Sequence, residues 1–317
     1  MRGLSHASKG RILGGMEHPR LSRFKRSPAA TPFQLTERDR EIIRQVNRHR
    51  FLRSPQIIGL VGGSAQQILR RLQRLYHAGY LARPKAQLEY FRTGGSHHMV
   101  YGLGNKGASF INGEGRDSAY PRSSEKNQGI GRVFLNHALM VSDVMVEIEL
   151  ACRESGRVRL LWGNELPVSG TLPRPFRWRV KLKNGRKRGV IPDRVFALES
   201  MGQNVVNQRA FFFLEADRGT TPVLRTDMSQ NSMYRKFLSY EATWAQAVHQ
   251  KQFGFHRFRV LTVTTSAKRV ASLIQACRKL EQGHGLFLFA NLNALKGRIL
   301  SEVWNTCRED GASSLLN

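Results

Sequence analysis

The chain of 317 residues has few cysteines and no long apolar segment. Cys152, Cys277 and Cys307 are widely spaced and form no CxxC motif, so we expect neither a disulfide framework nor a zinc site, and a reducing cytoplasm fits. No stretch approaches the roughly 18 apolar residues of a membrane-spanning helix. The N-terminus lacks the apolar core of a signal peptide. No Walker loop or dinucleotide-binding fingerprint is present, so no nucleotide cofactor is expected.

Acidic residues are also scarce. The chain contains 51 Lys and Arg against 23 Asp and Glu, which gives a net charge of +28 and a pI near 11.2. The basic residues continue throughout the chain, a pattern that favours contact with a phosphate backbone over a single localisation signal. An anionic membrane surface is the alternative partner, but no long basic amphipathic helix stands out. We therefore expect double-stranded DNA as the partner and no membrane.

Residues 1–34 predict a disordered basic arm, because they are rich in Arg, Gly, Ser and Pro and lack apolar periodicity. Order should begin at Thr36, which suits a helix N-cap. Asp39 then stands at the third helical position, where a carboxylate complements the helix dipole.

Residues 35–111 predict a winged helix-turn-helix. Ser54-Pro55 opens a second helix and Ser64 caps a third. Two β-like runs follow, Tyr80–Arg92 and Met99–Leu103, with a hairpin turn between them at 93–96. A further short helix is expected at 105–111.

The third helix, Ser64–Ala78, takes the position of the recognition helix, which lies in the major groove. Ile68, Leu69, Leu72 and Leu75 are expected to face the core. Gln and Arg can contact adenine and guanine edges, and Arg also binds phosphate. The alternative is a solvated face on a domain that binds protein. The residues predicted to bind DNA on this helix and the hairpin are Gln66, Gln67, Arg70, Arg71, Arg74, Arg83, Lys85 and Arg92.

A linker at 112–130 leads to a second domain at 131–295, and residues 296–317 are expected to form a C-terminal tail. The domain begins with a long amphipathic helix at about 132–155. The order of elements after it suggests an α/β sandwich with a mixed central sheet. The expected strands are 158–162, 177–183, 189–198, 209–216, 257–264 and 286–290, and the expected helices are 229–251 and 267–282.

Three carboxylates on two of these strands predict a metal site. If the strands form a hairpin about a loop near 199–208, Asp193 and Glu215 lie nearly opposite each other. Asp217 follows Glu215 by two residues, so a regular strand points both to one face. Converging carboxylates suit Mg²⁺ or Mn²⁺. Lys236, on the next helix, could stabilise charge at a scissile phosphate.

Further residues could complete this site, or the acids could be structural. The candidates on the long helix are Glu147, Glu149, His137 and Asp143. In the structural alternative, the carboxylates pair with Arg194, Arg218 or Arg235. A basic turn at 185–189 either tracks phosphate beside the acids or is a plain solvated hairpin.

Several short motifs follow one another along the chain. They are Leu35-Thr36-Glu37-Arg38-Asp39, His49-Arg50-Phe51-Leu52, Arg70–Leu75, Ala78-Gly79-Tyr80-Leu81, Asn136-His137-Ala138-Leu139, Pro192-Asp193, Phe213–Thr220, Tyr234-Arg235-Lys236 and Tyr240. As an ordered set they resemble the replication-relaxation family over roughly residues 35–290. The resemblance implies a winged helix, plasmid or mobile-element DNA, and a role in replication or its control in a bacterial cytoplasm.

The second half also resembles the PD-(D/E)XK nuclease fold, so the resemblance implies a restriction-endonuclease-like domain. That superfamily places an acid on the first core helix, an Asp on one strand and Glu-x-Lys on the next. Asp193 and Glu215 match the two strand acids. Asp217 departs from the pattern, because it stands where Lys is expected. Lys236 or Arg218 would have to replace that lysine for cleavage.

The sequence therefore predicts a DNA-binding protein of a plasmid or mobile element. In a metal-dependent endonuclease, Asp193, Glu215 and Asp217 would bind Mg²⁺ or Mn²⁺ and Lys236 would join them in catalysis. The alternative is a non-enzymatic regulator of transcription or replication, or a plasmid mobilisation accessory factor, whose nuclease-like domain binds only DNA or a partner. Replication or conjugation proteins are the expected protein partners. The oligomeric state stays open and a dimer is compatible.

Overall fold

A computed structural model describes most of the chain beyond the N-terminal arm. The described residues are 23–26, 33–88, 97–114, 127, 129–167, 176–201, 208–227, 229–302, 304–308 and 311–316. Most of the predicted arm, the predicted turn at 93–96, Arg92 and most of the predicted linker lie outside them.

The N-terminal part consists of helices around a small antiparallel sheet with the strand order β1-β3-β2. The expected long strand from residue 80 ends after two residues, because Pro84 lacks an N–H for the ladder and starts a 3₁₀ turn. The elements are α1 (Glu37–His49), β1 (Leu52–Arg53), α2 (Ser54–Val61), α3 (Ala65–His77), β2 (Leu81–Ala82), η1 (Lys85–Gln87), β3 (Val100–Leu103) and α5 (Asn105–Gly113).

The start of α1 is fixed by the cap that the sequence predicts. The Asp39 N–H donates to Thr36 Oγ1 at 3.3 Å, and the Thr36 N–H donates to Asp39 Oδ2 at 2.8 Å. This reciprocal pair satisfies two backbone donors that a helix N-terminus otherwise leaves free. Arg71 of α3 donates from Nε to Asp39 Oδ1 at 2.7 Å, so the cap also joins α1 to α3.

The second part is built on a mixed seven-stranded sheet with the order β12-β11-β10-β9-β8-β7-β4. Strand β9 is parallel to both of its neighbours, β8 and β10, and all other neighbouring pairs are antiparallel. A separate two-stranded sheet joins β5 and β6. The strands are β4 (Val158–Trp162), β5 (Trp178–Lys181), β6 (Lys187–Val190), β7 (Arg194–Ser200), β8 (Arg209–Asp217), β9 (Phe258–Thr264), β10 (Phe287–Asn291), β11 (Trp304–Asn305) and β12 (Ala312–Ser313).

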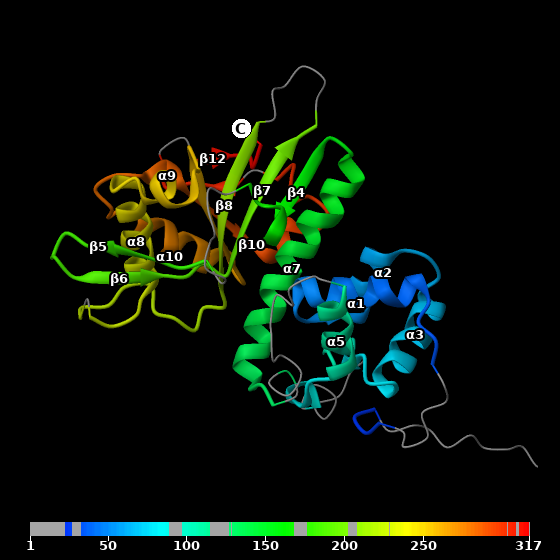
Figure 1. The fold of residues 1–317 in the computed structure, drawn as a ribbon. Helices are drawn as coiled ribbons and strands as arrows, with labels where there is room; N and C mark the ends of the chain where they lie inside the picture. The colour runs from blue at the N-terminus through cyan, green and yellow to red at the C-terminus, as the bar shows by residue number, and fades with distance from the viewer. Residues whose placement is uncertain are drawn as a thin grey trace, which may run out of the picture.

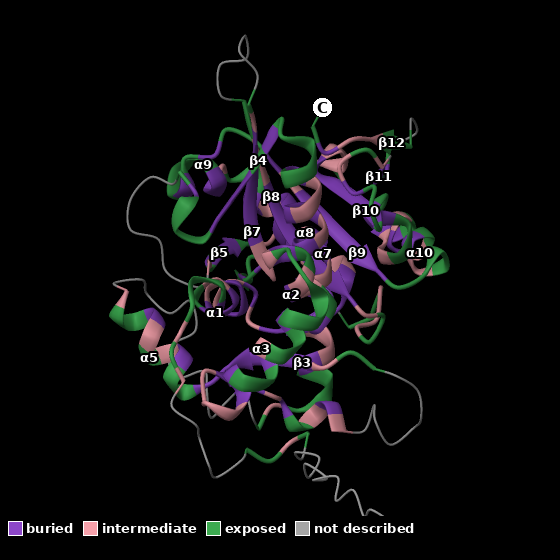
Figure 2. Cartoon of the chain, turned by 90° about the vertical axis from the view of Figure 1, so that its right-hand side faces the viewer, coloured by how far each residue is buried: buried purple, intermediate pink, exposed green. Residues whose placement is uncertain are grey.

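Helices cover both faces of this sheet (Figure 1). One apolar core lies between the sheet and α7, and a second lies between the sheet and the helices α8 and α10. Figure 2 shows the strands of the central sheet as largely buried. The helices of this part are α7 (Arg132–Ser155), α8 (Met233–Ala245), α9 (Val248–Phe253), α10 (Ala267–Cys277) and α11 (Leu292–Leu295), and the 3₁₀ turns are η2 (Gly163–Glu165) and η3 (His284–Leu286).

In this part, the main differences from the prediction are two breaks within expected elements and two added strands. Pro192 separates β6 from β7, where one strand was expected, and the left-handed backbone of Ala247 (φ 52°) separates α8 from α9. The segment expected as a tail supplies β11 and β12. Its Trp304 and Leu315 are fully buried in the core under α7, so burial of apolar side chains holds it to the sheet.

Helix α7 belongs to both parts of the molecule. Its Val146 packs in the core of the N-terminal part, and its Met145 packs in the core of the sheet. On the same helix, Glu149 Oε2 lies 3.1 Å from Nε2 of His49 at the end of α1. Among the described residues, no helix is long and apolar enough to cross a membrane.

Candidate functional site

The register of β7 and β8 places Asp193 opposite Glu215. The ladder pairs Arg194 with Leu214, and Asp193 immediately precedes it. The Asp193 N–H donates to the Leu214 carbonyl at 3.0 Å, and Asp193 Oδ2 accepts from the Ala216 N–H at 2.8 Å. The predicted register, in which the two strands form a hairpin about a loop near 199–208, is confirmed. The first acid therefore lies at the point where β7 begins, held by the backbone of β8.

Glu215 lies on β8 and faces α8. Its Oε2 accepts from Lys236 Nζ at 2.5 Å, and its Oε1 accepts from the Tyr240 hydroxyl at 2.5 Å. Lys236 and Tyr240 are four residues apart, so one face of α8 supplies both donors. The side chain of Glu215 is 3% exposed and that of Lys236 is 39% exposed. The buried carboxylate thus lies behind a lysine that reaches solvent.

Burial and the neighbouring charges together raise the pKa values of Glu215, Lys236 and Tyr240. Burial raises the pKa of Glu215 above its usual value and outweighs the attraction of Lys236. Burial opposes the charge on Lys236, but Glu215 and Asp193 outweigh it, so the pKa of Lys236 is raised. Burial raises the pKa of Tyr240 well above its usual value, which keeps its hydroxyl protonated as a donor.

Asp193 is held from the opposite helix layer. His137 of α7 places Nε2 at 2.9 Å from Asp193 Oδ1. Burial disfavours the charge on Asp193, but the hydrogen bond to His137 and the charges of His137 and Lys236 outweigh it and lower its pKa. The side chain of His137 is 36% exposed, so this end of the site is open to solvent. His137 is the one α7 candidate that reaches the acids.

Asp217 has a separate partner. Arg269 of α10 donates from Nε to Asp217 Oδ2 at 2.7 Å, and both side chains are largely buried. Thr264 donates to the same oxygen at 3.4 Å. Within the described residues, no group of three or more His, Cys, Asp or Glu is placed to hold a metal ion. Of the three predicted metal ligands, Asp193 and Glu215 are therefore the two that lie next to each other.

The other acids of α7 lie elsewhere. Glu147 accepts from the Gly297 N–H at 3.0 Å, and Asp143 accepts from the Gln56 side chain at 2.8 Å. The arginines expected to pair with the site acids have other partners: Arg218 donates to the Val133 carbonyl, and Arg235 donates to the Ser229 carbonyl. Arg194 donates to the backbone carbonyl of Asp193. The acids are instead paired with His137 of α7, Lys236 of α8 and Arg269 of α10.

Helix α3 presents most of its predicted DNA-binding side chains to solvent. Gln66, Gln67, Arg70 and Arg74 are exposed, as is Lys85 in η1. The expected inward face holds for three of the four apolar residues. Leu69 is the exception, because it is 46% exposed on the same side as the polar residues.

Two other predicted contacts have structural roles. Arg71 is half-buried and bonded to Asp39 at the start of α1. Arg83 stacks over the Tyr76 ring at 4.1 Å and donates to the Tyr101 hydroxyl at 3.3 Å. Both guanidinium groups therefore connect elements of the N-terminal part.

The sequence interpretation did not assign Tyr240 or Arg269 to the site. The spacing of Lys236 and Tyr240 is a usable signal, because residues four apart share one face of a helix. No comparable signal marks Arg269, which comes from a helix 52 residues beyond Asp217.

The chain matches the model of one protein family, described as Replication-relaxation, over residues 43–257. The matched range covers most of α1, all of α2 and α3, the strands that carry the carboxylates, and α8. No curated protein matches the chain. No solved structure matches it either.

Proposed function

Because the chain belongs to the replication-relaxation family, we propose that it binds the DNA of a plasmid or other mobile element. It acts there in replication or its control, in the bacterial cytoplasm. The observation that carries the proposal is the convergence of Asp193, Glu215 and Lys236 at an accessible end of the sheet in a strongly basic chain. A polyanion and a divalent cation are the ligands that this combination suits.

The N-terminal part serves as a winged helix-turn-helix in this proposal. Helix α3 follows α2 after a short turn and leaves Gln66, Arg70 and Arg74 exposed. These side-chain types read bases and bind phosphate in the major groove. The antiparallel pair β2 and β3 follows, with Lys85 exposed beside it.

The second part serves as the nuclease-like domain. Mg²⁺ is commonly held by one or two protein carboxylates together with substrate phosphates, so Asp193 and Glu215 fit a Mg²⁺ or Mn²⁺ ion. When bound, such an ion would polarise the phosphate and activate water. Lys236 would place its charge beside a phosphate oxygen, in the role that Asp217 cannot take. His137 would orient Asp193, and Tyr240 would orient Glu215.

A non-enzymatic DNA clamp or docking domain is the second candidate. It is favoured by the ion pair of Asp217 with Arg269, and by the fact that Asp193 and Glu215 also have protein partners. Carboxylates that are already paired can stabilise the fold without binding metal. In both candidates the chain as a whole binds DNA, so a metal-dependent reaction is what separates them.

The test is incubation of the purified chain with supercoiled and linear DNA in Mg²⁺, in Mn²⁺ and in EDTA. We expect nicking or cutting that needs metal and that disappears in Asp193→Asn/Glu215→Gln. These substitutions keep side-chain size while removing both charges. Glu147→Gln is the control, because it changes an acid of α7 that lies outside the site.

The same variants are compared for DNA binding by fluorescence anisotropy. Cleavage that persists in the double variant would contradict the site assignment. DNA binding without metal-dependent cleavage under any of the conditions would contradict the nuclease candidate and favour the clamp. Absence of DNA binding would contradict both.

A further inference from the structure

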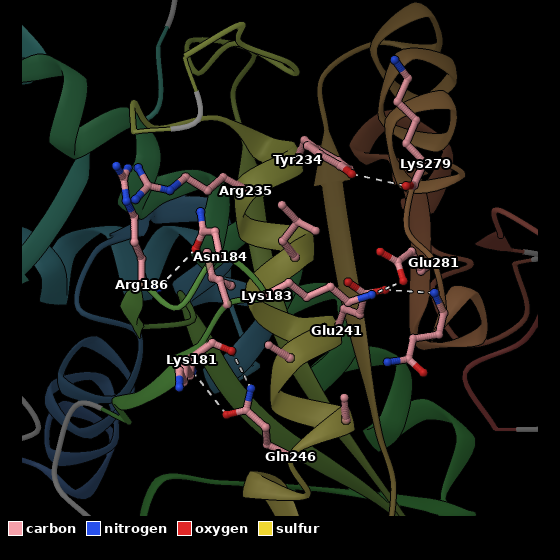
Figure 3. A pocket seen from close by; sticks show the side chains of 15 residues that line it. Lys181, Lys183, Asn184, Arg186, Tyr234, Arg235, Glu241, Gln246, Lys279 and Glu281 are labelled. Atoms are coloured by element: carbon pink, nitrogen blue, oxygen red, sulfur yellow. Dashed lines mark hydrogen bonds and ion pairs between the residues drawn. The ribbon is translucent and has the colours of Figure 1, made fainter.

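A cavity lies on the far side of α8 from Asp193 and Glu215. The cavity has a volume of about 250 Å³ and is enclosed by the β5–β6 turn, α8 and the segment after α10. Its α8 lining includes Leu238, Glu241 and Ala245, which helical spacing places opposite Lys236 and Tyr240. Figure 3 shows the charged side chains of these three segments gathered around the opening. The cavity is therefore separate from the site described above.

The rim of the cavity is cationic. Five basic side chains line it against two carboxylates, those of Glu241 and Glu281. Lys183 pairs with Glu281, but both side chains are more than half exposed, so this contact contributes little and can open. The basic residues are Lys181, Lys183, Arg186, Arg235 and Lys279. Such a set attracts a phosphate group.

The floor has a different character. Leu182, Leu238, Ala242 and Ala245 supply apolar surface, against which a flat ring can be buried. At one end, the Tyr234 hydroxyl donates to the Lys279 carbonyl at 3.2 Å. The cavity thus combines an apolar floor with a basic edge, as small-ligand sites commonly do.

Glu241 adds a specific acceptor. The residue is 5% exposed and lines the cavity. Its Oε1 accepts from the Gln282 N–H at 2.9 Å, and the described residues supply no hydrogen bond to its Oε2. A carboxylate oxygen that lines a basic cavity is suited to an amino group on the ligand. Carboxylates accept from the N4 amino group of cytosine in the same way.

We propose that this cavity binds one nucleotide, with phosphate at the basic rim, the base on the apolar floor and an exocyclic amino group directed to Glu241. This proposal rests on the proposed function in one respect, because the choice of a deoxynucleotide as ligand assumes that the protein acts on DNA. A free deoxynucleotide and the 5′ end of a DNA strand share this chemistry. The volume of about 250 Å³ lies just below the roughly 300–1,000 Å³ of drug-sized ligand pockets, so the cavity suits a ligand no larger than a single nucleotide.

The experiment is calorimetric titration of the full chain with dCMP, dTMP and inorganic phosphate. We expect dCMP to bind best. Inorganic phosphate should bind about tenfold more weakly because it cannot occupy the floor, and dTMP should bind more weakly than dCMP because it lacks the amino group. A short single strand with a 5′-phosphorylated dC, titrated in parallel, separates the two sources. Binding of that strand assigns a strand end, and binding of dCMP alone assigns the free nucleotide.

Two variants locate the binding. Ala245→Leu fills the cavity without changing any charge, and Lys181→Ala/Arg186→Ala removes two rim cations. Each should weaken dCMP binding about tenfold. Arg257→Ala/Lys268→Ala removes the same charge from exposed positions outside the cavity and should leave dCMP binding within about twofold.

The proposal is overturned if dCMP does not bind, if phosphate binds as tightly as dCMP, or if Ala245→Leu binds dCMP normally. Duplex binding is measured on the same variants and should be unchanged, because α3 lies outside the cavity. Nucleotide binding without duplex binding would leave this site standing and remove the proposed function. Duplex binding without nucleotide binding would contradict this site and leave the proposed function standing.

Discussion

At the scale of single residues, each carboxylate of the candidate site has a side-chain partner from a different helix. Asp193 is held by α7, Glu215 by α8 and Asp217 by α10. The pair of Asp217 and Arg269 differs from the others because both side chains are largely buried. Removal of one member of a buried pair leaves an uncompensated charge, which costs more than loss of the pair itself.

We therefore expect Arg269→Ala to lower the free energy of unfolding by about 3 kcal/mol. Asp217→Asn/Arg269→Ala should lower it less, because the stranded charge is gone. Urea denaturation of the two variants and the unsubstituted chain measures both values. A double variant that is as unstable as Arg269→Ala would show that the lost packing of Arg269, and not the charge of Asp217, causes the effect.

These residues also show what the sequence could predict at this scale. The position of the loop between β7 and β8 was enough to place Asp193 opposite Glu215, because the loop of a hairpin sets the register of its two antiparallel strands. The alternation of a strand was enough to place Asp217 on the face of Glu215. The partner of Asp217 was not predictable, because Arg269 arrives through the packing of a distant helix, and no local pattern records that packing.

At the scale of elements, α7 connects the two parts of the molecule through a buried polar contact. His49, at the end of α1, meets Glu149, and Arg48 and Arg153 lie within ion-pair distance of the same carboxylate. Burial alone would raise the pKa of Glu149, but the hydrogen bond to His49 and the charge of Arg48 lower it to about 2. Burial lowers the pKa of His49 below its usual value.

Both shifts predict a loss of stability on acidification. The pKa of Glu149 is depressed from 4.5 to about 2, so its contribution is present above pH 4.5 and is lost as the pH falls toward 2. His49 acts in the same direction below its usual pKa of 6.5, because the unfolded chain takes up the proton first. The full loss of the contribution of Glu149 lowers the free energy of unfolding by roughly 3 kcal/mol. The measurement is the free energy of unfolding at a series of pH values.

Glu149→Gln should show a shallower loss below pH 4.5 than the unsubstituted chain, since it has no carboxylate to protonate at this contact. Glu154→Gln changes an exposed acid of the same helix and should leave the pH profile unchanged. Identical slopes for the two variants would show that the contact between α1 and α7 does not govern the acid response.

Prediction from the sequence was uneven among the elements. Apolar periodicity identified α1, α3 and α7, and candidate capping residues marked the starts of α1 and α3, because these signals are local. The strands β11 and β12 have two residues each, too few for a periodic pattern. They form because Trp304 and Leu315 find a core that distant segments build, which only the tertiary structure reveals.

At the scale of the whole molecule, the net charge of +28 makes any binding of DNA strongly dependent on salt. The charge does not act evenly, because several arginines are engaged within the fold. Arg71 and Arg83 join elements of the N-terminal part, while Arg70 and Arg74 remain exposed on α3. The exposed residues are the ones expected to displace counterions from DNA.

Under the proposed function, Arg70→Ala/Arg74→Ala should weaken duplex binding and reduce the slope of log K against log salt by about 2, one for each lost phosphate contact. Anisotropy titrations over a range of salt concentrations measure the slope. Arg257→Ala/Lys268→Ala removes the same charge from the second part and serves as the control. If both double variants lower the slope equally, the total charge governs binding and α3 is not the recognition helix. A reduced slope in the α3 variant alone would locate the duplex on that helix, because the two proteins carry the same net charge.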